Sequence, residues 1–163
     1  MINRLQKGLV DLIYGVGRVR TKYERENPDE KVVAADGSKA ITTKGDKEIE
    51  RGLEWVGSRR AVVMLTDKRV TCDNWDIPFE NIETAQLLKI GSLFGQGQVL
   101  KIKTKDNNHY QFGMQFNPKW TDQNVLPLTF EQGKIKTSTF SLIVRLIVIG
   151  YFIYWALERF ELI

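Results

Sequence analysis

The sequence predicts a mainly β domain that follows an amphipathic helix and precedes a membrane-spanning helix. Three observations predict this fold class. Apolar residues recur with a helical period over residues 2–23, short β-branched runs separated by turn residues fill residues 31–116, and an apolar run occupies residues 140–157. We therefore expect an N-terminal helix in residues 1–28, a β domain in 29–136 and a membrane-spanning helix in 137–163.

The composition excludes several classes of protein. With 163 residues, 42% of them apolar and 27% charged, the chain suits one globular core rather than a disordered or polytopic protein. Its one cysteine, Cys72, excludes an internal disulfide and a multi-thiolate metal site. Its one histidine, His109, excludes the usual His-based zinc site. The net charge of +4 permits contact with anionic lipid or nucleic acid without requiring either.

The N-terminal segment has the pattern of a basic amphipathic helix. Spacings of three, four and seven residues define an apolar stripe of Ile2, Leu5, Leu9, Leu12, Ile13, Val16 and Tyr23. Its basic side chains are Arg4, Lys7, Arg18, Arg20 and Lys22. Such a helix commonly lies on an anionic membrane or in a partner's groove, and the alternative is a helix docked on its own domain. We expect it to lie along the cytoplasmic membrane face and to end at Asn27-Pro28.

The middle of the chain changes from a helical to a strand-like period. Candidate strands are residues 31–35, 39–43, 52–57, 60–66, 69–74, 98–105 and 109–116. Turn residues 66–68 and 106–108 are expected to join two antiparallel pairs. Asn117-Pro118 predicts the start of a short helix that stops at Pro127, and a further strand-like pair extends to residue 135.

Four ordered segments of this region carry a family resemblance. They read LTDKRV at residues 65–70, IPFENI at 77–82, GSLFGQG at 91–97 and LKIKT at 100–104. This set, within residues 45–116, resembles the bacterial pleckstrin-homology-like (PH-like, GRAM-like) domains. The resemblance implies two packed antiparallel sheets in a partly open barrel or sandwich, closed by a C-terminal helix. In this chain the closing helix is expected to be short, and the three glycines of residues 91–97 are expected to form a turned or mobile loop.

The C-terminal run predicts a membrane anchor. Residues 140–157 read FSLIVRLIVIGYFIYWAL, which makes about 27 Å of helix at 1.5 Å per residue. Phe140 begins this run, and Tyr151, Tyr154 and Trp155 suit a headgroup boundary near its end. Arg145 is expected to snorkel to the nearer interface. The alternative is a buried core helix in a soluble protein.

Flanking charges predict the orientation of that anchor. Lys134 and Lys136 precede the run, whereas the charges that follow it nearly cancel. The positive-inside rule then keeps the N-terminal bulk in the cytoplasm, and the chain is expected to be a single-pass, tail-anchored membrane protein.

No residue pattern indicates catalysis. Residues 15–17 and 91–97 lack the remaining positions of the dinucleotide and P-loop motifs. His109 stands alone after a turn, and the carboxylates of Asp73, Asp76 and Glu80 suit a solvated loop better than a hydrolytic pair. We therefore expect no enzymatic activity, no cofactor and no metal site.

Binding is better supported than catalysis. Four basic residues around one predicted hairpin are candidate lipid contacts: Arg59, Arg60, Lys68 and Arg69. Solvated turn charges explain them more simply. Nucleic acid is not expected as a partner, because no aromatic residues are interleaved with a basic stripe.

These observations favour a non-enzymatic, membrane-anchored PH-like module that mediates protein or lipid contacts at the cytoplasmic membrane face. Its expected partners are the lipid bilayer and other membrane proteins. The alternative is a small structural or accessory subunit of a larger membrane complex, in which the two terminal helices are the docking elements.

Overall fold

The computed structural model describes residues 2–46, 50–51, 57–92, 95–133, 136–137 and 139–159. The chain forms two units. The first comprises Met1–Lys47 and Ser58–Lys134, and the second comprises Glu48–Gly57 and Ile135–Ile163. Each unit is described by itself.

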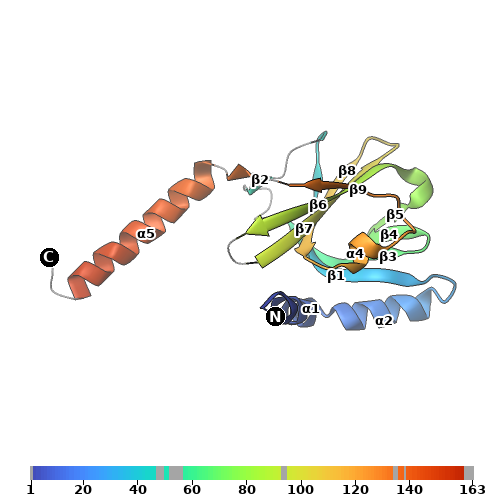
Figure 1. Cartoon of the computed structure of the whole chain (residues 1–163), viewed down its shortest axis with the longest axis horizontal. Helices are drawn as coiled ribbons and strands as arrows, with labels where there is room; N and C mark the ends of the chain where they lie inside the picture. The colour runs from blue at the N-terminus through green and yellow to red at the C-terminus, as the bar shows by residue number, and fades with distance from the viewer. Residues whose placement is uncertain are drawn as a thin grey trace. The chain divides into compact units, whose positions relative to one another are not determined.

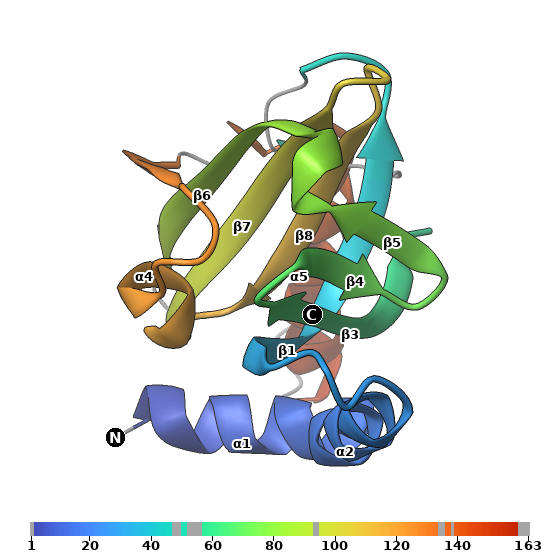
Figure 2. The same ribbon diagram turned by 90° about the vertical axis from the view of Figure 1, so that its right-hand side faces the viewer.

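The first unit is built on an eight-stranded sheet that curls into a half-barrel (Figures 1 and 2). The strand order is β5-β4-β3-β1-β8-β7-β6-β9, and all neighbours are antiparallel except β6 and β9. The strands are β1 (Val32–Thr43), β3 (Arg59–Thr66), β4 (Arg69–Cys72), β5 (Trp75–Pro78), β6 (Ile82–Ser92), β7 (Gly95–Thr104), β8 (His109–Gln115) and β9 (Thr129–Gln132). A short 3-10 helix, η1 (Phe79–Asn81), joins β5 to β6. The expected mainly β class is found, but the described strands of the first unit form one curled sheet rather than the two packed sheets expected.

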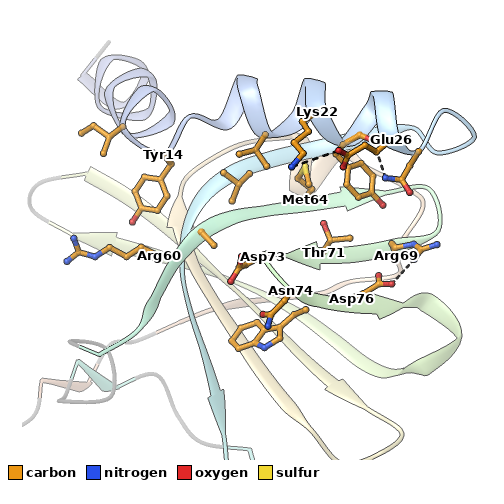
Figure 3. A pocket seen from close by; sticks show the side chains of 17 residues that line it. Tyr14, Lys22, Glu26, Arg60, Met64, Arg69, Thr71, Asp73, Asn74 and Asp76 are labelled. Atoms are coloured by element: carbon orange, nitrogen blue, oxygen red, sulfur yellow. Dashed lines mark hydrogen bonds and ion pairs between the residues drawn. The ribbon is translucent and has the colours of Figure 1, made fainter.

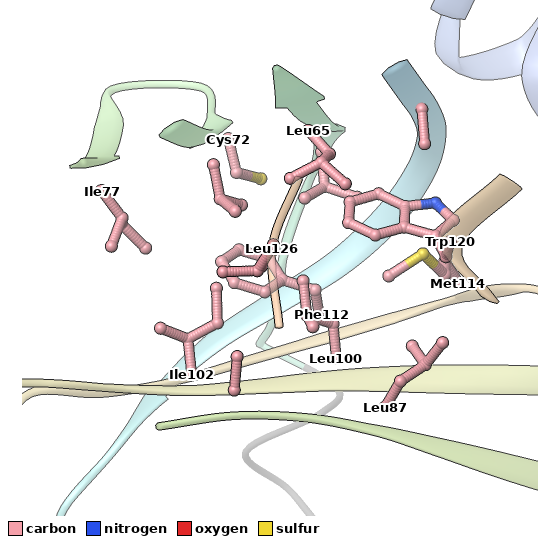
Figure 4. Close-up of a cluster of buried hydrophobic side chains, with 14 of the residues drawn as sticks. Leu65, Cys72, Ile77, Leu87, Leu100, Ile102, Phe112, Met114, Trp120 and Leu126 are labelled. Carbon is pink, nitrogen blue, oxygen red and sulfur yellow. The ribbon is translucent and has the colours of Figure 1, made fainter. Parts of the chain in front are cut away.

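The apolar core lies on the inner face of the curl (Figure 4). Trp120, on the four-residue helix α4 (Lys119–Asp122), enters this core and is fully buried. Leu126 follows it into the same cluster, so the segment after β8 covers the barrel interior. The other fully buried large apolar side chains are Leu65, Leu87, Leu100, Ile102 and Phe112.

The two predicted turns are confirmed. Val63 pairs with Cys72 across the β3–β4 hairpin, and Lys103 pairs with His109 across the β7–β8 hairpin. The hydroxyl of Thr66 accepts bonds from the backbone amides of Lys68 at 3.1 Å and Arg69 at 3.0 Å. This local bond explains the threonine that opens the first turn.

Several strands differ from the expected ones. The two predicted strands at 31–35 and 39–43 are one continuous strand, β1, because Asp36, Gly37 and Ser38 stay in the ladder with β3. The predicted strand 69–74 ends at Cys72, since Asp73 adopts a left-handed φ of 56° and turns the chain into β5. Residues 91–97 are not one long loop, because Gly91 and Gly97 belong to the β6–β7 ladder. The predicted strand 52–57 falls almost wholly outside the described residues.

The expected N-terminal helix is divided in two. Helix α1 (Ile2–Tyr14) and helix α2 (Val16–Glu26) meet at Gly15, whose φ of 63° is left-handed and ends the first helix. Both helices lie on the outer side of the sheet next to β1 (Figure 2). Val16 packs there with Val62 and Met64 in a second apolar cluster.

The second unit holds the long C-terminal helix. Strands β2 (Glu50–Arg51) and β10 (Lys136–Thr137) pair in parallel, and helix α5 spans Thr139–Arg159. Its described large apolar side chains between residues 143 and 155 are all exposed, namely Ile143, Val144, Leu146, Ile147, Val148, Ile149, Tyr151, Phe152, Ile153, Tyr154 and Trp155.

The predicted membrane-spanning helix is wrong. Across the described ranges, no helix combines the length and the apolar character that crossing a membrane requires. The apolar run of α5 also contains a charged residue. Arg145 leaves residues 146–157 as the longest uncharged part of α5. That part makes about 18 Å of helix, against the roughly 30 Å of a hydrocarbon core. The side chains of Phe140 and Arg145 themselves lie outside the described part of the structure.

Candidate binding surface on the N-terminal helices

Helix α1 docks on the sheet through its polar side. The Nζ of Lys7 bonds the carboxylate of Asp11 at 2.6 Å and also bonds the carboxylate of Asp36 in β1. The ring of Tyr14 packs against the backbone of Gly37 so closely that a Cβ there would lie 2.6 Å from Tyr14 Cγ. Lys7, Asp11 and Tyr14 are spaced by four and three residues, so they form one face of the helix.

Asp36 links this helix to the core. Its side chain is 1% exposed, and its carboxylate also accepts bonds from Asn117 Nδ2 and from Trp120 Nε1, each at 2.7 Å. Three donors therefore satisfy a buried charge that would otherwise be costly. The docking of α1 and the placement of Trp120 depend on the same carboxylate.

The opposite side of α1 faces solvent and is apolar. Leu9, Leu12 and Ile13 are 60%, 77% and 71% exposed. We call these three side chains the outer apolar face. An amphipathic helix on a globular domain usually buries its apolar stripe. Helix α1 instead presents its apolar stripe to solvent and its polar side to the sheet. A contiguous exposed apolar surface of this kind marks an interaction site. The side chain of Leu5 lies outside the described residues.

Helix α2 adds positive charge beside this face. Arg20 is held by Glu24 at 2.8 Å, whereas Arg18 and Arg25 are exposed and Lys22 reaches only to 3.9 Å from Glu26. Four basic and two acidic side chains occur in its eleven residues, so its net charge is positive. Arg4, the remaining predicted basic contact, has a side chain outside the described residues.

A groove of about 860 Å³ opens between α2 and strands β3–β5 (Figure 3). Its helical wall includes Ile13 of the outer apolar face and Val19, which is 37% exposed. Its floor includes Val62, Met64 and Trp75. Because Ile13 belongs to both, the groove and the outer apolar face are continuous.

One end of the groove is closed by a charged network. Tyr23 Oη donates to Glu30 at 2.8 Å, and Arg69 bridges Glu30 at 2.7 Å and Asp76 at 2.6 Å. Burial alone would raise the pKa of Glu30, but the Tyr23 bond and the Arg69 charge outweigh it and lower that pKa. Burial and the bond to Glu30 raise the pKa of Tyr23. Glu30 therefore stays ionised and Tyr23 neutral at physiological pH.

Two polar atoms of the groove lack a partner among the described residues: Thr71 Oγ1 and Arg69 Nε. The Thr71 side chain points into the groove from the middle of β4 (Figure 3), and the residue is 7% exposed. A buried polar atom without a hydrogen bond typically costs about 1–3 kcal/mol. Such atoms are normally completed by an ordered water or by a group of a ligand.

The basic cluster predicted from the sequence is divided by the structure. Arg59 and Arg60 begin β3, whereas Lys68 and Arg69 lie at its other end, roughly 20 Å away along the strand. Arg59 pairs with Asp73 at 2.8 Å and lies over the Trp75 ring. Only Arg60 and Arg69 line the groove.

Two other reactive side chains, Cys72 and His109, are buried. Burial raises the pKa of Cys72 to about 11, with Ser38 Oγ 3.7 Å from its sulfur. His109 is buried rather than exposed, and its ring Nε2 lies 3.4 Å from Asn107 Oδ1. In the described part of the chain, no three His, Cys, Asp or Glu side chains are grouped to hold a metal ion.

Comparison of the chain with models of protein families and with curated proteins finds no match. The function is therefore argued from the surface itself. A curled sheet does not by itself name a family.

Proposed function

We propose that this chain is a non-enzymatic PH-like binding module that docks on an anionic membrane surface through α1 and α2. One observation carries the proposal: α1 is fixed to its own domain by Lys7 and Tyr14, which leaves Leu9, Leu12 and Ile13 in solvent. The domain holds an apolar helix face outward, where an external surface can bury it.

The two helices supply different contributions to such docking. Full burial of a leucine or isoleucine is worth about 1.5–3 kcal/mol, and partial insertion into a headgroup region gives a fraction of this for each residue of the outer apolar face. A lysine or arginine near an anionic leaflet adds about 1 kcal/mol. Arg18, Lys22 and Arg25 on α2 are the exposed cations that supply it.

The PH-like part of the proposal is supported by the shape of the first unit. Its antiparallel hairpins curl into a partly open barrel, and the short α4 places Trp120 in the core where the resemblance leads us to expect a closing helix. The parallel strand β9 is a departure from that pattern.

The test uses the full chain with an environment-sensitive fluorophore on Leu12→Cys. The native thiol of Cys72 is buried, so the label goes to the introduced cysteine. On vesicles that contain phosphatidylglycerol, the emission is expected to shift to the blue, and Leu9→Asp should weaken the shift. A label on Phe130→Cys is the matched control, because Phe130 is 50% exposed on β9, away from α1.

Two outcomes would overturn this function. If vesicles retain the chain while the fluorophore at position 12 stays in water, α1 does not contact the membrane. Equal blue shifts at positions 12 and 130 would likewise show nonspecific adsorption rather than docking by the outer apolar face.

A second candidate function is favoured by α5. Its described apolar side chains are exposed all along residues 143–155, and so large an apolar surface requires a covering partner. We propose as the alternative that the chain is an accessory subunit whose α5 packs in a larger protein complex. Purification in mild detergent followed by mass determination tests it, and a chain that elutes alone would contradict it.

A further inference from the structure

We infer that the groove between α2 and strands β3–β5 binds an uncharged, extended polypeptide segment of a partner protein. Thr71 and Arg69 would bond its backbone, and the apolar floor would receive one of its side chains. The groove shares Ile13 and Lys22 with the proposed membrane contact, but its argument does not depend on that contact.

The first support is the spacing of the unsatisfied donors. Thr71 and Arg69 are two residues apart on β4, so their side chains leave the same face of the strand. That repeat is about 6.6 Å. An extended peptide shows carbonyl groups on one side with the same two-residue repeat, so one segment can offer acceptors to both Thr71 Oγ1 and Arg69 Nε. Thr71 reaches its acceptor by rotating about χ1, a change between staggered rotamers.

The second support is the apolar part of the groove. Val62 and Met64 of β3 and Val19 of α2 supply apolar lining, and Trp75 lines the groove where β5 begins. Aromatic residues, methionine and arginine are the types enriched at the centres of protein interfaces. An alternating extended segment that directs its carbonyls to β4 also directs an apolar side chain to this floor.

The third support is the balance of charge. The ionisable lysine, arginine and acidic side chains that line the groove are Lys22, Glu26, Arg60, Arg69, Asp73 and Asp76, three of each sign. Two of the acids already have a close cation, with Asp73 held by Arg59 at 2.8 Å and Asp76 by Arg69 at 2.6 Å. A free phosphate or an anionic headgroup would therefore meet as much repulsion as attraction. An uncharged segment fits this balance.

The experiment selects a ligand and then removes its contacts one at a time. A phage-displayed library of random ten-residue peptides is panned on the immobilised full chain, and the enriched peptides are synthesised. Their affinity is measured by fluorescence anisotropy for the wild type, Thr71→Val, Val19→Asp and Thr121→Val. Thr121→Val is the matched control, because Thr121 Oγ1 also lacks a partner among the described residues but lies outside the groove.

The expected result is specific to the groove. Thr71→Val should weaken the affinity for the peptide about threefold to tenfold, which is the range for the loss of one hydrogen bond. Val19→Asp should abolish binding, and Thr121→Val should leave it unchanged. Thr71→Val should not lower the thermal midpoint below that of the wild type, since the hydroxyl has no bond to lose.

Three outcomes would overturn the inference. The first is a library that enriches no peptide on the wild type above the level on Val19→Asp. The second is an enriched peptide whose affinity Val19→Asp leaves intact. The third is a lipid response in NMR spectra: the soluble lipid dihexanoylphosphatidylcholine shifts the methyl resonances of Thr71 and Val62, and the peptides do not. That last result would make the groove a lipid site, and it would leave the vesicle test of α1 unaffected.

Discussion

The indole Nε1 of Trp120 donates a hydrogen bond to the buried carboxylate of Asp36 at 2.7 Å, although the two residues are 84 positions apart. The same carboxylate receives Lys7 from α1. One acidic side chain therefore ties the outermost helix of the first unit to the centre of its core.

Replacing that carboxylate should be costly. Asp36→Ala leaves Lys7 without its buried partner and two core donors without an acceptor, so we expect a loss of about 3–5 kcal/mol in the free energy of unfolding. Urea titration measures it. Asp11→Ala is the matched control, because it removes only the part-buried i,i+4 partner of the same lysine, worth about 0.5 kcal/mol. Equal losses would show that the Asp36 network contributes no more than a surface pair.

The contact between Tyr14 and Gly37 predicts a steric effect. Gly37→Ala adds a Cβ 2.6 Å from Tyr14 Cγ, so α1 must shift. We expect this shift to lower the free energy of unfolding by about 1–3 kcal/mol. Hydrogen exchange should then speed up in α1 before it does in the sheet. Gly17→Ala in α2 meets no atom within 4 Å and should instead stabilise by up to about 1 kcal/mol. If α1 of Gly37→Ala keeps its full protection from hydrogen exchange, the docking of α1 through Tyr14 is wrong.

Glu30 predicts acid sensitivity. Its pKa is lowered in the folded state, so it contributes stability above its ordinary pKa of 4.5 and loses that contribution as pH falls through the folded pKa. Between about pH 6 and about pH 3, the wild type should lose more unfolding free energy than Glu30→Gln. Denaturant titrations across this range measure the difference. Glu24→Gln, on an exposed pair with Arg20, should follow the wild type instead.

The burial of Cys72 predicts that its thiol does not react in the folded protein. The pKa of this thiol is about 11, so at pH 8, which is about three units lower, very little of it is ionised. The side chain is also completely buried. A disulfide reagent should therefore modify it only as fast as the barrel opens. The exposed Leu12→Cys variant supplies the fast reference rate. Immediate stoichiometric modification of the native wild type would contradict the burial of this residue.

Charge on α2 predicts the salt dependence of membrane docking. Arg18→Gln and Lys22→Gln should each weaken binding to anionic vesicles about fivefold, the equivalent of about 1 kcal/mol per cation. Arg20→Gln should have a smaller effect, because Arg20 is held by Glu24. Co-sedimentation at rising salt measures all three, and binding that salt does not weaken would exclude an electrostatic contribution.

Local periodicity predicts much of this fold but not all of it. The strands around residues 60–66, 98–105 and 109–116 carry clear β-branched patterns and turn residues, and they form as expected. Strand β5 has only four residues and ends in Pro78, so its local signal is weak. Strand β6 mixes polar residues with Ala85 and Leu87, and its pairing with β7 comes from contacts distant in sequence.

The binding surface shows where sequence reasoning ends. The apolar stripe of α1 and its basic residues are visible in the sequence, but the direction the stripe faces is decided by Asp36, 29 positions beyond Lys7. The groove has no local signal at all. Thr71 and Val19 become neighbours only when α2 packs across the sheet.

The sheet does not close on itself, because β5 and β9 are its two outer strands. Ile77 of β5 and Leu87 of β6, the strand next to β9, belong instead to one apolar cluster with Trp120 and Leu126. These margins can part without breaking any ladder of backbone bonds. Apolar contacts weaken on cooling, and pressure favours states in which water fills the voids between them. High pressure or supercooling should therefore loosen the apolar contacts between these two margins first, while β1, β8 and β7 at the middle of the sheet stay paired.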